Sequence, residues 1–404
     1  MKRFNTTAVC IPSKHYMVDL TERVKEIRKL VDDGKYFTIN RARQYGKTST
    51  LYALRKFLED DYFVLDLSFE GITHANFETE QSFVKAFCRL LKKDTFLYRV
   101  IPEEIKSQLE DYMNRREDKA QLDELFITLG EWNAVSDRPI VLFIDEIDSA
   151  TNNQVFLDFL ALLREGYINR ETKDAPTFQS VILAGVTDVK HLKSKIRDEA
   201  DAKENSPWNI AADFLVDMSL SEEGIRGMLE EYEADHQIGM NAGEIAKRIR
   251  EYTNGYPFLV SRICQLLDER FVPDTFATLS DAWTDDGVET AVKAILVEKN
   301  TLFDSLMGKI RSFDGLREKL REILFRGETM AYTPDSKEQE QLIMYGFLVN
   351  QHNTVVVANK IFEMRLYNYF IGESKFSEEL RGDAQDNKPE FIKGGELNVP
   401  LIME

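Results

Sequence analysis

The sequence predicts an α/β protein: a parallel sheet covered by helices, followed by a helical domain and a small winged-helix domain. Three observations carry this prediction. Between residues 35 and 218, short apolar runs alternate with longer amphipathic runs, the pattern of parallel strands joined by helices. Beyond Met218 the strand-like runs vanish, and after residue 300 two short ones return beside helical runs. A chain of 404 residues also has room for two or three domains.

Five short apolar runs are interpreted as strands. They are KYFTIN at 35–40, YFVLDLSF at 62–69, PIVLFI at 139–144, FQSVILAG at 178–185 and DFLVDM at 213–218. Helices are expected between them, at 47–58, at 80–92, as a polar pair within 102–134, and at 154–168. One such run alone also fits a buried helix segment, but five in alternation favour the sheet.

The chain is expected to divide into four parts. They are the sheet domain at 1–218, a helical lid domain at 219–299, a winged helix at 300–372 and a polar tail or linker at 373–404. A serine before Glu222 and Glu223 is a helix-capping pattern that opens the lid. Three helical runs and then two strand-like runs, joined by His352 and Asn353, predict the winged helix. The tail is expected to be weakly ordered, with its apolar end LNVPLIME packed on a surface.

A phosphate-binding loop is predicted between the first strand and the first helix. The run RARQYGKTS places a GKT sequence at the start of the helix, where backbone N–H groups cradle phosphates, a lysine reaches them and a hydroxyl ligates Mg²⁺. Arg41 stands where the usual pattern has its first glycine, but this removes no phosphate ligand. The flanking strand and helix favour a nucleotide site over a chance GKT in a solvated loop. The expected contacts to the nucleotide are Arg43, Gln44, Tyr45, Gly46, Lys47, Thr48 and Ser49.

An acidic motif follows the third strand, in PIVLFIDEIDSA at 139–150. The strand delivers Asp145 to the carboxyl edge of the sheet, where open α/β sheets bind ligands. Asp145 is expected to ligate Mg²⁺ together with Thr48, and Glu146 to polarise the attacking water. Asp148 is a candidate for supporting these ligands. Acidic residues are common in loops, so the motif alone does not indicate a metal site. It does so because a GKT helix precedes it in the sequence.

Further polar residues are candidates for completing this site. The fourth strand ends before Thr187 and Asp188, and beside the Asp145 strand either residue would lie near the γ-phosphate as a sensor; alternatively, Asp188 caps the next helix. Arg164 and Arg170 lie on or after the helix that follows Asp145. One of them is a candidate arginine finger for a neighbouring subunit, or both are solvated cations at a helix end. Oligomerisation therefore stays open.

These motifs together carry a family resemblance. The runs RARQYGKTS, VLFIDEID, VILAGVTD, SPWNIAADFLVDMSLSEEGI, NGYPFLVSRIC and GFLVN…VVVANKIF resemble the bacterial AAA-like ATPase-domain proteins, near the STAND and archaeal-ATPase groups of P-loop NTPases. The resemblance covers about residues 10 to 372. It implies an additional-strand ATPase core, a helical lid and a winged helix. In the wider group the glycine and proline of a GxP motif touch the nucleotide, and the matching residues here are Gly255 and Pro257.

The sequence also departs from that family pattern. Many relatives begin the loop with a glycine or with RPR, whereas this chain has Arg41, Ala42 and Arg43. Asp19 in YMVDLTER stands where the wider group has the glycine of its base-binding motif, so contacts to the base are less secure than contacts to the phosphates. The run GELNVPLIME resembles the point where longer relatives continue into a PD-(D/E)xK nuclease-like domain.

Composition limits the classes of partner. The net charge is −18, which disfavours sequence-independent attraction to nucleic acid or anionic lipid. Over 300–372, nine Lys and Arg are balanced by nine Asp and Glu, so DNA binding by the winged helix is a minority interpretation. No apolar run is long enough to span a membrane and no secretory signal is recognised, so a cytoplasmic location is expected. Three scattered cysteines suggest neither a disulfide framework nor a zinc site.

The function expected from these features is that of an AAA-like, STAND-related ATP-binding protein. Binding of ATP with Mg²⁺, and slow hydrolysis, would control the conformation of a protein partner or of an appended effector. The alternative is a nucleotide-bound scaffold or switch that does not hydrolyse ATP. The sequence favours neither a particular partner nor a particular biological process.

Overall fold

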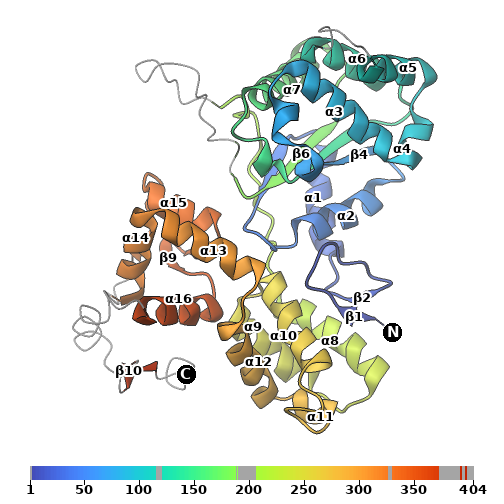
Figure 1. The fold of residues 1–404 in the computed structure, drawn as a ribbon. Helices are drawn as coiled ribbons and strands as arrows, with labels where there is room; N and C mark the ends of the chain where they lie inside the picture. The colour runs from blue at the N-terminus through green and yellow to red at the C-terminus, as the bar shows by residue number, and fades with distance from the viewer. Residues whose placement is uncertain are drawn as a thin grey trace. The chain divides into compact units, whose positions relative to one another are not determined.

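The computed structural model describes residues 2–114, 121–187, 189, 206–325, 330–372, 392–393 and 396–397. The chain forms two compact units (Figure 1). The sheet unit comprises residues 20–41 and 47–217, and the helical unit comprises residues 1–19, 42–46 and 218–404. Asp188 and most of the predicted tail lie outside the described residues. Residues 42–46 of the predicted phosphate loop group with the helical unit, and the residues on either side group with the sheet unit.

A parallel sheet with the strand order β3-β6-β5-β4 is the centre of the sheet unit. Its strands are β3 (Phe37–Asn40), β4 (Phe63–Ser68), β5 (Ile140–Asp145) and β6 (Ser180–Gly185). In register, Ile39 lies beside Ala184, and Leu183 lies beside Ile144. The strand that comes last in the chain, β6, thus lies between the phosphate-loop strand and the strand that ends at Asp145. This inserted strand is what the additional-strand resemblance implies.

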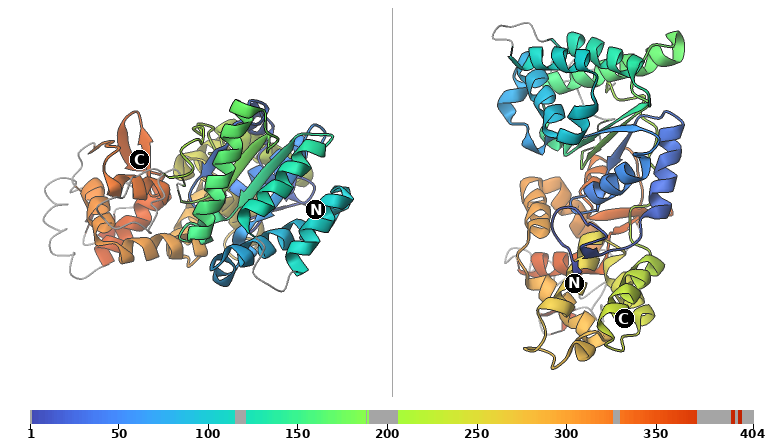
Figure 2. Two further views of the ribbon diagram at one scale, coloured as in Figure 1. Left: turned by 90° about the horizontal axis from the view of Figure 1, so that it is seen from above. Right: turned by 90° about the vertical axis from the view of Figure 1, so that its right-hand side faces the viewer.

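Helices cover both faces of the sheet (Figures 1 and 2). The helices of this unit are α1 (Thr21–Asp32), α2 (Lys47–Leu58), α3 (Glu80–Lys93), α4 (Thr95–Val100), α5 (Glu103–Asn114), α6 (Leu122–Val135) and α7 (Gln154–Lys173). Leu65, Leu142 and Leu183 belong to the apolar core that includes α3, α6 and α7. Because alternate side chains of a strand point to opposite faces, Asp66 and Asp145 point to the face that α2 covers, where Arg55 and Thr48 contact them.

The fifth predicted strand, at 213–218, is wrong. Next to β3 the chain forms only one isolated parallel bridge, between Phe37 and Ala212. Beyond that point the Arg41 guanidinium donates to the carbonyl of Val216 at 3.1 Å, an acceptor that a continued ladder would use. The Phe214 ring stacks on Phe37 at 5.7 Å, so the apolar character that suggested a strand serves side-chain packing instead.

The helical unit begins with a short parallel pair and continues with five helices. These elements are β1 (Arg3–Phe4), β2 (His15–Tyr16), α8 (Glu222–His236), α9 (Ala242–Thr253), α10 (Pro257–Glu269), α11 (Leu279–Ala282) and α12 (Asp285–Val297). The predicted cap is present, because the Ser221 hydroxyl accepts the N–H of Gly224 at 3.0 Å. Phe4 and Tyr16 pack against Tyr232, which explains why the first 19 residues group with these helices.

The C-terminal part of the helical unit contains helices and an antiparallel sheet. Its elements are α13 (Thr301–Ser312), α14 (Asp314–Phe325), β7 (Met330–Ala331), α15 (Lys337–Met344), β8 (Leu348–Gln351), β9 (Thr354–Val357) and α16 (Lys360–Gly372), with β10 (Ile392–Lys393) paired to β11 (Glu396–Leu397). The sheet has the order β7-β9-β8. His352 and Asn353 both have positive φ, 51° and 63°, as a two-residue hairpin turn requires. These are elements that a winged helix needs, and its assignment stays a prediction.

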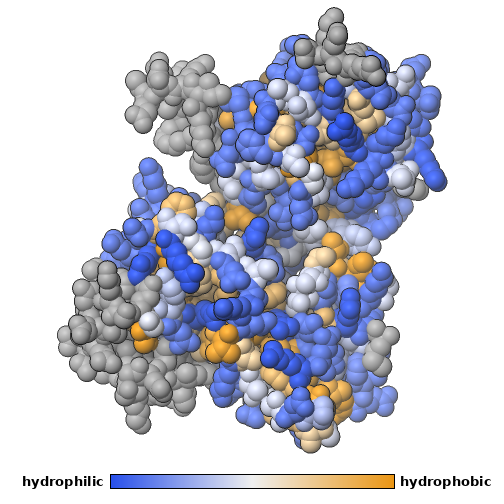
Figure 3. Space-filling model, in the orientation of Figure 1, coloured by the Kyte–Doolittle hydropathy of each residue, from blue (hydrophilic) through white to orange (hydrophobic). Residues whose placement is uncertain are grey.

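One apolar core joins the helices on both sides of residue 300. It includes Leu259 and Ile263 of α10, Phe303 of α13, and Ile361 and Phe362 of α16, all between 0% and 2% exposed. The described surface seen in Figure 3 is mostly hydrophilic, with apolar side chains scattered over it. Among the helices that the structure describes, none has the length and apolar character to cross a membrane.

Candidate nucleotide site

The phosphate loop follows β3 and ends where α2 begins at Lys47. Gln44 and Gly46 have positive φ values of 56° and 79°, so the loop turns sharply before the helix. The N-terminus of α2 carries the positive end of the helix dipole, which favours a phosphate group. Of the other predicted contacts, Arg43 is exposed and Ser49, the third residue of α2, is half-buried.

Arg41, the residue in place of the first loop glycine, has contacts of its own within the sheet unit. Its guanidinium donates to the carbonyls of Asn40 at 3.0 Å and Val216 at 3.1 Å. It also lies 5.4 Å from the centre of the Phe214 ring, at the distance of a cation–π contact. The side chain therefore tethers the start of the loop to the segment at 214–216, and it does not occupy the place of a phosphate ligand.

Lys47 is 7% exposed, and its ammonium group donates to the carbonyl of Arg41 at 2.9 Å. A buried ammonium needs partners of this kind. The carbonyl is a neutral acceptor, so a phosphate oxygen, which is charged, is a stronger partner for the same ammonium. Lys47 is thus placed where the loop would bring phosphates.

The structure brings Thr48 and Asp145 together. Thr48 Oγ1 donates to Asp145 Oδ2 at 2.7 Å, and the other carboxylate oxygen accepts the N–H of Glu146 at 2.9 Å. Asp145 is only 5% exposed. A hydroxyl and a carboxylate in contact are the hard oxygen donors that Mg²⁺ prefers, so these residues fit the metal that the loop implies.

Glu146 has a backbone conformation that is uncommon for a residue with a side chain. Its φ and ψ are 56° and 45°, in the left-handed region, and such outliers cluster at functional sites. The side chain is half-buried. This conformation turns the chain directly after β5.

Asp148 connects the acidic motif to the end of β6. It lies in the short 3-10 helix η3 (Ile147–Ser149). Its carboxylate accepts the N–H groups of Val186, at 2.8 and 3.1 Å, and of Thr187, at 2.8 Å. Asp148 therefore fixes the backbone of Thr187 next to the Asp145 strand. The other sensor candidate, Asp188, lies outside the described residues.

The two arginines of α7 have different surroundings. The Arg170 guanidinium donates to the carbonyls of Gly34 at 2.8 Å, Phe178 at 3.0 Å and Gln179 at 2.9 Å, so it joins α7 to two loops of its own unit. Arg164 is half-buried, and its Nε has no hydrogen-bond partner in the part of the chain that the structure describes. Of the two finger candidates, Arg164 is the one that is not bound to three carbonyls.

Within the helical unit, the GxP residues lie against the loop. Pro257 is the first residue of α10, and a Cβ placed on Gly46 would lie 3.7 Å from its ring. Gly255 has a φ of 70°, and a Cβ there would lie 2.2 Å from the carbonyl of Leu220, so only glycine fits. The Tyr256 hydroxyl donates to the carbonyl of Arg43.

A charged group that the motifs did not reveal lies beside the site. Arg55 of α2 contacts Asp66 of β4 at 3.5 Å and Asp94 at 2.9 Å. Burial raises the pKa of Asp66, and the neighbouring Arg55 lowers it in part. The polar Asp66 within a buried strand was the only signal in the sequence, and no spacing rule links it to Arg55 or to Asp94.

Comparison with known proteins agrees with this geometry. The family model described as an AAA-like domain matches residues 4–370. An uncharacterized WD repeat-containing protein of Synechocystis is 25% identical over 371 residues, which are 87% of this chain and 29% of that protein. The chain thus spans less than a third of that relative.

Solved structures show similarity of fold. The Walker-type ATPase of Pyrococcus abyssi has a TM-score of 0.58 at 14% identity, covering 90% of this chain and 99% of that one. The Thermotoga maritima RuvB Holliday junction branch migration motor has a TM-score of 0.41 at 13% identity, covering 86% and 94%. Because the AAA-like model covers nearly the whole chain, this protein belongs to the AAA-like domain family.

Proposed function

We propose that this protein binds ATP with Mg²⁺ through Lys47, Thr48 and Asp145. The observation that carries the proposal is the 2.7 Å hydrogen bond from Thr48 Oγ1 to Asp145 Oδ2. It joins the helix after the loop to the acid at the end of β5, and this pair of oxygen donors is the one that holds Mg²⁺ in phosphate-loop proteins. When bound, Mg²⁺ supplies positive charge that neutralises the phosphate oxygens.

The remaining loop residues have supporting roles in this proposal. Backbone N–H groups from Arg43 to Ser49 cradle the phosphates at the start of α2. The ammonium of Lys47 exchanges the carbonyl of Arg41 for a phosphate oxygen, because a charged acceptor binds it more strongly. Gly255 and Pro257 approach the nucleotide as the resemblance implies, and Thr187 acts as the polar sensor.

Calorimetric titration with Mg-ATP tests this site. Lys47→Ala should weaken binding about tenfold to a hundredfold or abolish it, since it removes a charge-assisted hydrogen bond. Lys56→Ala is the matched control, because Lys56 lies on the same helix but is exposed and pairs with Glu59 at 2.9 Å. Equal affinity in wild type and Lys47→Ala, with unchanged circular dichroism, contradicts the proposal.

We further propose slow hydrolysis, with Glu146 as the residue that orients the attacking water. Its left-handed backbone directly after Asp145 supports a role for its side chain in the site. Arg164 is proposed as the finger supplied to a neighbouring subunit. The second candidate function is a switch that holds ATP without turnover. Arg41 favours it, because the tethered residue in place of the first glycine restricts rearrangement of the loop.

The proposed output is control of a protein partner or an appended effector. The Synechocystis relative is a WD repeat-containing protein, of which the matched region is 29%. The region that matches this chain is therefore a minor part of that protein. This supports the interpretation that the AAA-like region regulates something joined to it or bound by it, and it identifies no partner for this chain.

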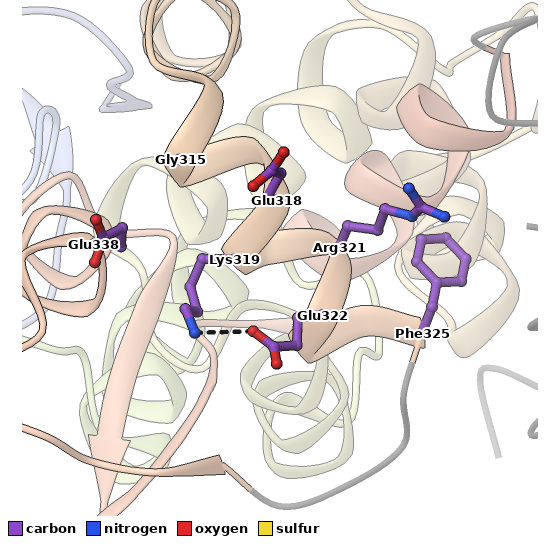
Figure 4. A pocket seen from close by; sticks show the side chains of 7 residues that line it. All are labelled: Gly315, Glu318, Lys319, Arg321, Glu322, Phe325 and Glu338. Carbon is purple, nitrogen blue, oxygen red and sulfur yellow. Dashed lines mark hydrogen bonds and ion pairs between the residues drawn. The ribbon is translucent and has the colours of Figure 1, made fainter.

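Contact with DNA through the C-terminal part is disfavoured. A cavity of about 560 Å³ lies over α14 and next to α15, and Glu318, Glu322 and Glu338 line it together with Lys319 and Arg321 (Figure 4). Lys319 is paired with Glu322 at 2.8 Å. Carboxylates on this face repel phosphates. Salt-sensitive binding to random duplex DNA would show that a basic face exists elsewhere.

A further inference from the structure

Tyr256, the residue between Gly255 and Pro257, binds the phosphate loop directly. Its hydroxyl donates to the carbonyl of Arg43. Its ring meets the ring of Tyr45 edge to face, with centroids 4.8 Å apart and planes at 78°. The side chain is 2% exposed, so solvent does not compete for this hydrogen bond. All three residues belong to the helical unit.

The other side of Tyr256 contacts the C-terminal helices. Its ring lies 5.2 Å from the Phe362 ring of α16, and the Phe362 ring lies 5.9 Å from the Phe303 ring of α13. The Arg365 guanidinium lies 4.9 Å from the centre of the Phe303 ring. A row of buried rings therefore runs from the phosphate loop to α13 and α16. Packed rows of this kind have few alternative arrangements, because interiors are dense.

Two more contacts join the same loop to the same part of the chain. Gln44 Nε2 donates to the Thr301 hydroxyl at the start of α13, at 3.3 Å. A Cβ placed on Gly346, in the turn between α15 and β8, would lie 2.5 Å from the Cβ of Ala42. The loop thus contacts the C-terminal part directly at two places, and the buried Tyr256 links the two a third time, through Arg43 on one side and Phe362 on the other.

The Tyr256 hydroxyl is a permanent donor. Burial raises the pKa of Tyr256, and the neighbouring Tyr45 raises it further, so the phenol stays protonated at all ordinary pH values. The loop carbonyl of Arg43 then keeps its hydrogen bond as long as the loop holds its present shape.

We propose that Tyr256 is the positioning residue of the phosphate loop, and that through its contact with Phe362 it transmits changes in the loop to α13 and α16. The proposal deepens the proposed function, because nucleotide binding is the event that would change the loop. The loop must present its N–H groups to phosphates, and a shift of the Arg43 carbonyl breaks or makes the bond to Tyr256.

The first test needs no nucleotide. Hydrogen exchange of amides 42–46 is compared in wild type, Tyr256→Phe, Phe362→Leu and Tyr252→Phe. Tyr252→Phe is the matched control, because Tyr252 is also buried in the helical unit, at 1% exposed, but its hydroxyl has no hydrogen-bond partner among the described residues. Tyr256→Phe and Phe362→Leu should each speed loop exchange about five- to tenfold, and the control should leave it unchanged. Unchanged exchange in either variant, or an equal rise in the control, overturns the proposal.

The second test adds Mg-ATP and follows exchange of amides 360–372 in α16. In wild type, binding of Mg-ATP should change the exchange rates of these amides. Tyr256→Phe should still bind Mg-ATP, but the change in its exchange rates should be at most half of the change in wild type. A full response in a nucleotide-saturated Tyr256→Phe overturns transmission through this residue. If wild type binds no nucleotide, the proposed function fails, and the loop exchange of the first test still decides whether Tyr256 positions the loop.

Discussion

Thr48 and Asp145 lie 97 positions apart in sequence, and their side chains form a 2.7 Å hydrogen bond. If this pair holds Mg²⁺, binding of ATP should lose its dependence on the metal when either oxygen donor is removed. Asp145→Asn should weaken Mg-ATP binding by about tenfold or more and leave binding of ATP in EDTA little changed. Calorimetry with and without Mg²⁺ measures both.

Thr48 offers its own matched pair of variants. Thr48→Ala removes the hydroxyl and should behave as Asp145→Asn does, whereas Thr48→Ser keeps the hydroxyl and should restore metal dependence. If ATP binding still depends on Mg²⁺ in both Asp145→Asn and Thr48→Ala, the metal is held by residues other than Thr48 and Asp145.

Glu146 distinguishes an ATPase from a switch. If its carboxylate orients the attacking water, Glu146→Gln should lower the rate of phosphate release about 10²- to 10⁴-fold and leave the affinity for Mg-ATP unchanged. Phosphate release under saturating Mg-ATP is the measurement, and Glu165→Gln, at an exposed position of α7, is the control. If wild type and Glu146→Gln release phosphate equally slowly while both bind ATP, the result favours the switch.

Local pattern was sufficient for the core of the fold. The helix predicted at 47–58 has those bounds in the structure, because a phosphate loop fixes where its helix starts. The strands that end at Asn40 and Gly185, and the strand predicted to end at Ile144 that ends at Asp145, followed from apolar runs bounded by polar residues. The segment at 213–218 has the same composition, yet it forms one bridge, since Arg41 and Phe37 provide it with side-chain contacts that no local pattern encodes.

The candidate site also contains residues that local sequence predicts and contacts that it does not. Lys47, Thr48 and Asp145 follow from motif spacing, because each motif is local and the sheet edge brings the two motifs together. The contacts of Arg41 to Val216 and of Tyr256 to Arg43 join residues 175 and 213 positions apart. Nothing in one sequence indicates such pairs, and for the same reason residues 1–19 were not expected to pack with the helices after 218.

Arg41 should matter for stability. Its guanidinium holds two backbone carbonyls and lies against Phe214, and for a half-buried side chain loss of these contacts should cost about 1 kcal/mol. Arg41→Ala should therefore lower the unfolding free energy of the sheet unit, measured by urea denaturation. Arg89→Ala is the control, because Arg89 is an exposed position of α3. Equal unfolding free energies of the two variants would show that the contacts of Arg41 do not stabilise the sheet unit.

Asp66 should make the stability of the sheet unit depend on pH in the direction opposite to most carboxylates. Burial raises the pKa of Asp66 above its ordinary value of 3.8, so the folded chain binds this proton more tightly than the unfolded chain. The resulting stabilisation is complete below pH 3.8 and is lost as the pH rises through the raised pKa. Paired carboxylates with lowered pKa values contribute in the reverse sense.

Because many carboxylates titrate in the same range, the measurable quantity is the difference between wild type and Asp66→Asn, in which residue 66 cannot ionise. The unfolding free energy of wild type minus that of Asp66→Asn should fall as the pH rises from below 3.8 towards neutrality. Urea denaturation at a series of pH values gives this difference, and Asp60→Asn, at an exposed position, gives its baseline. A difference that stays constant would mean that the contact with Arg55 offsets burial completely, and a difference that rises with pH would mean that this contact outweighs burial; either outcome contradicts the prediction.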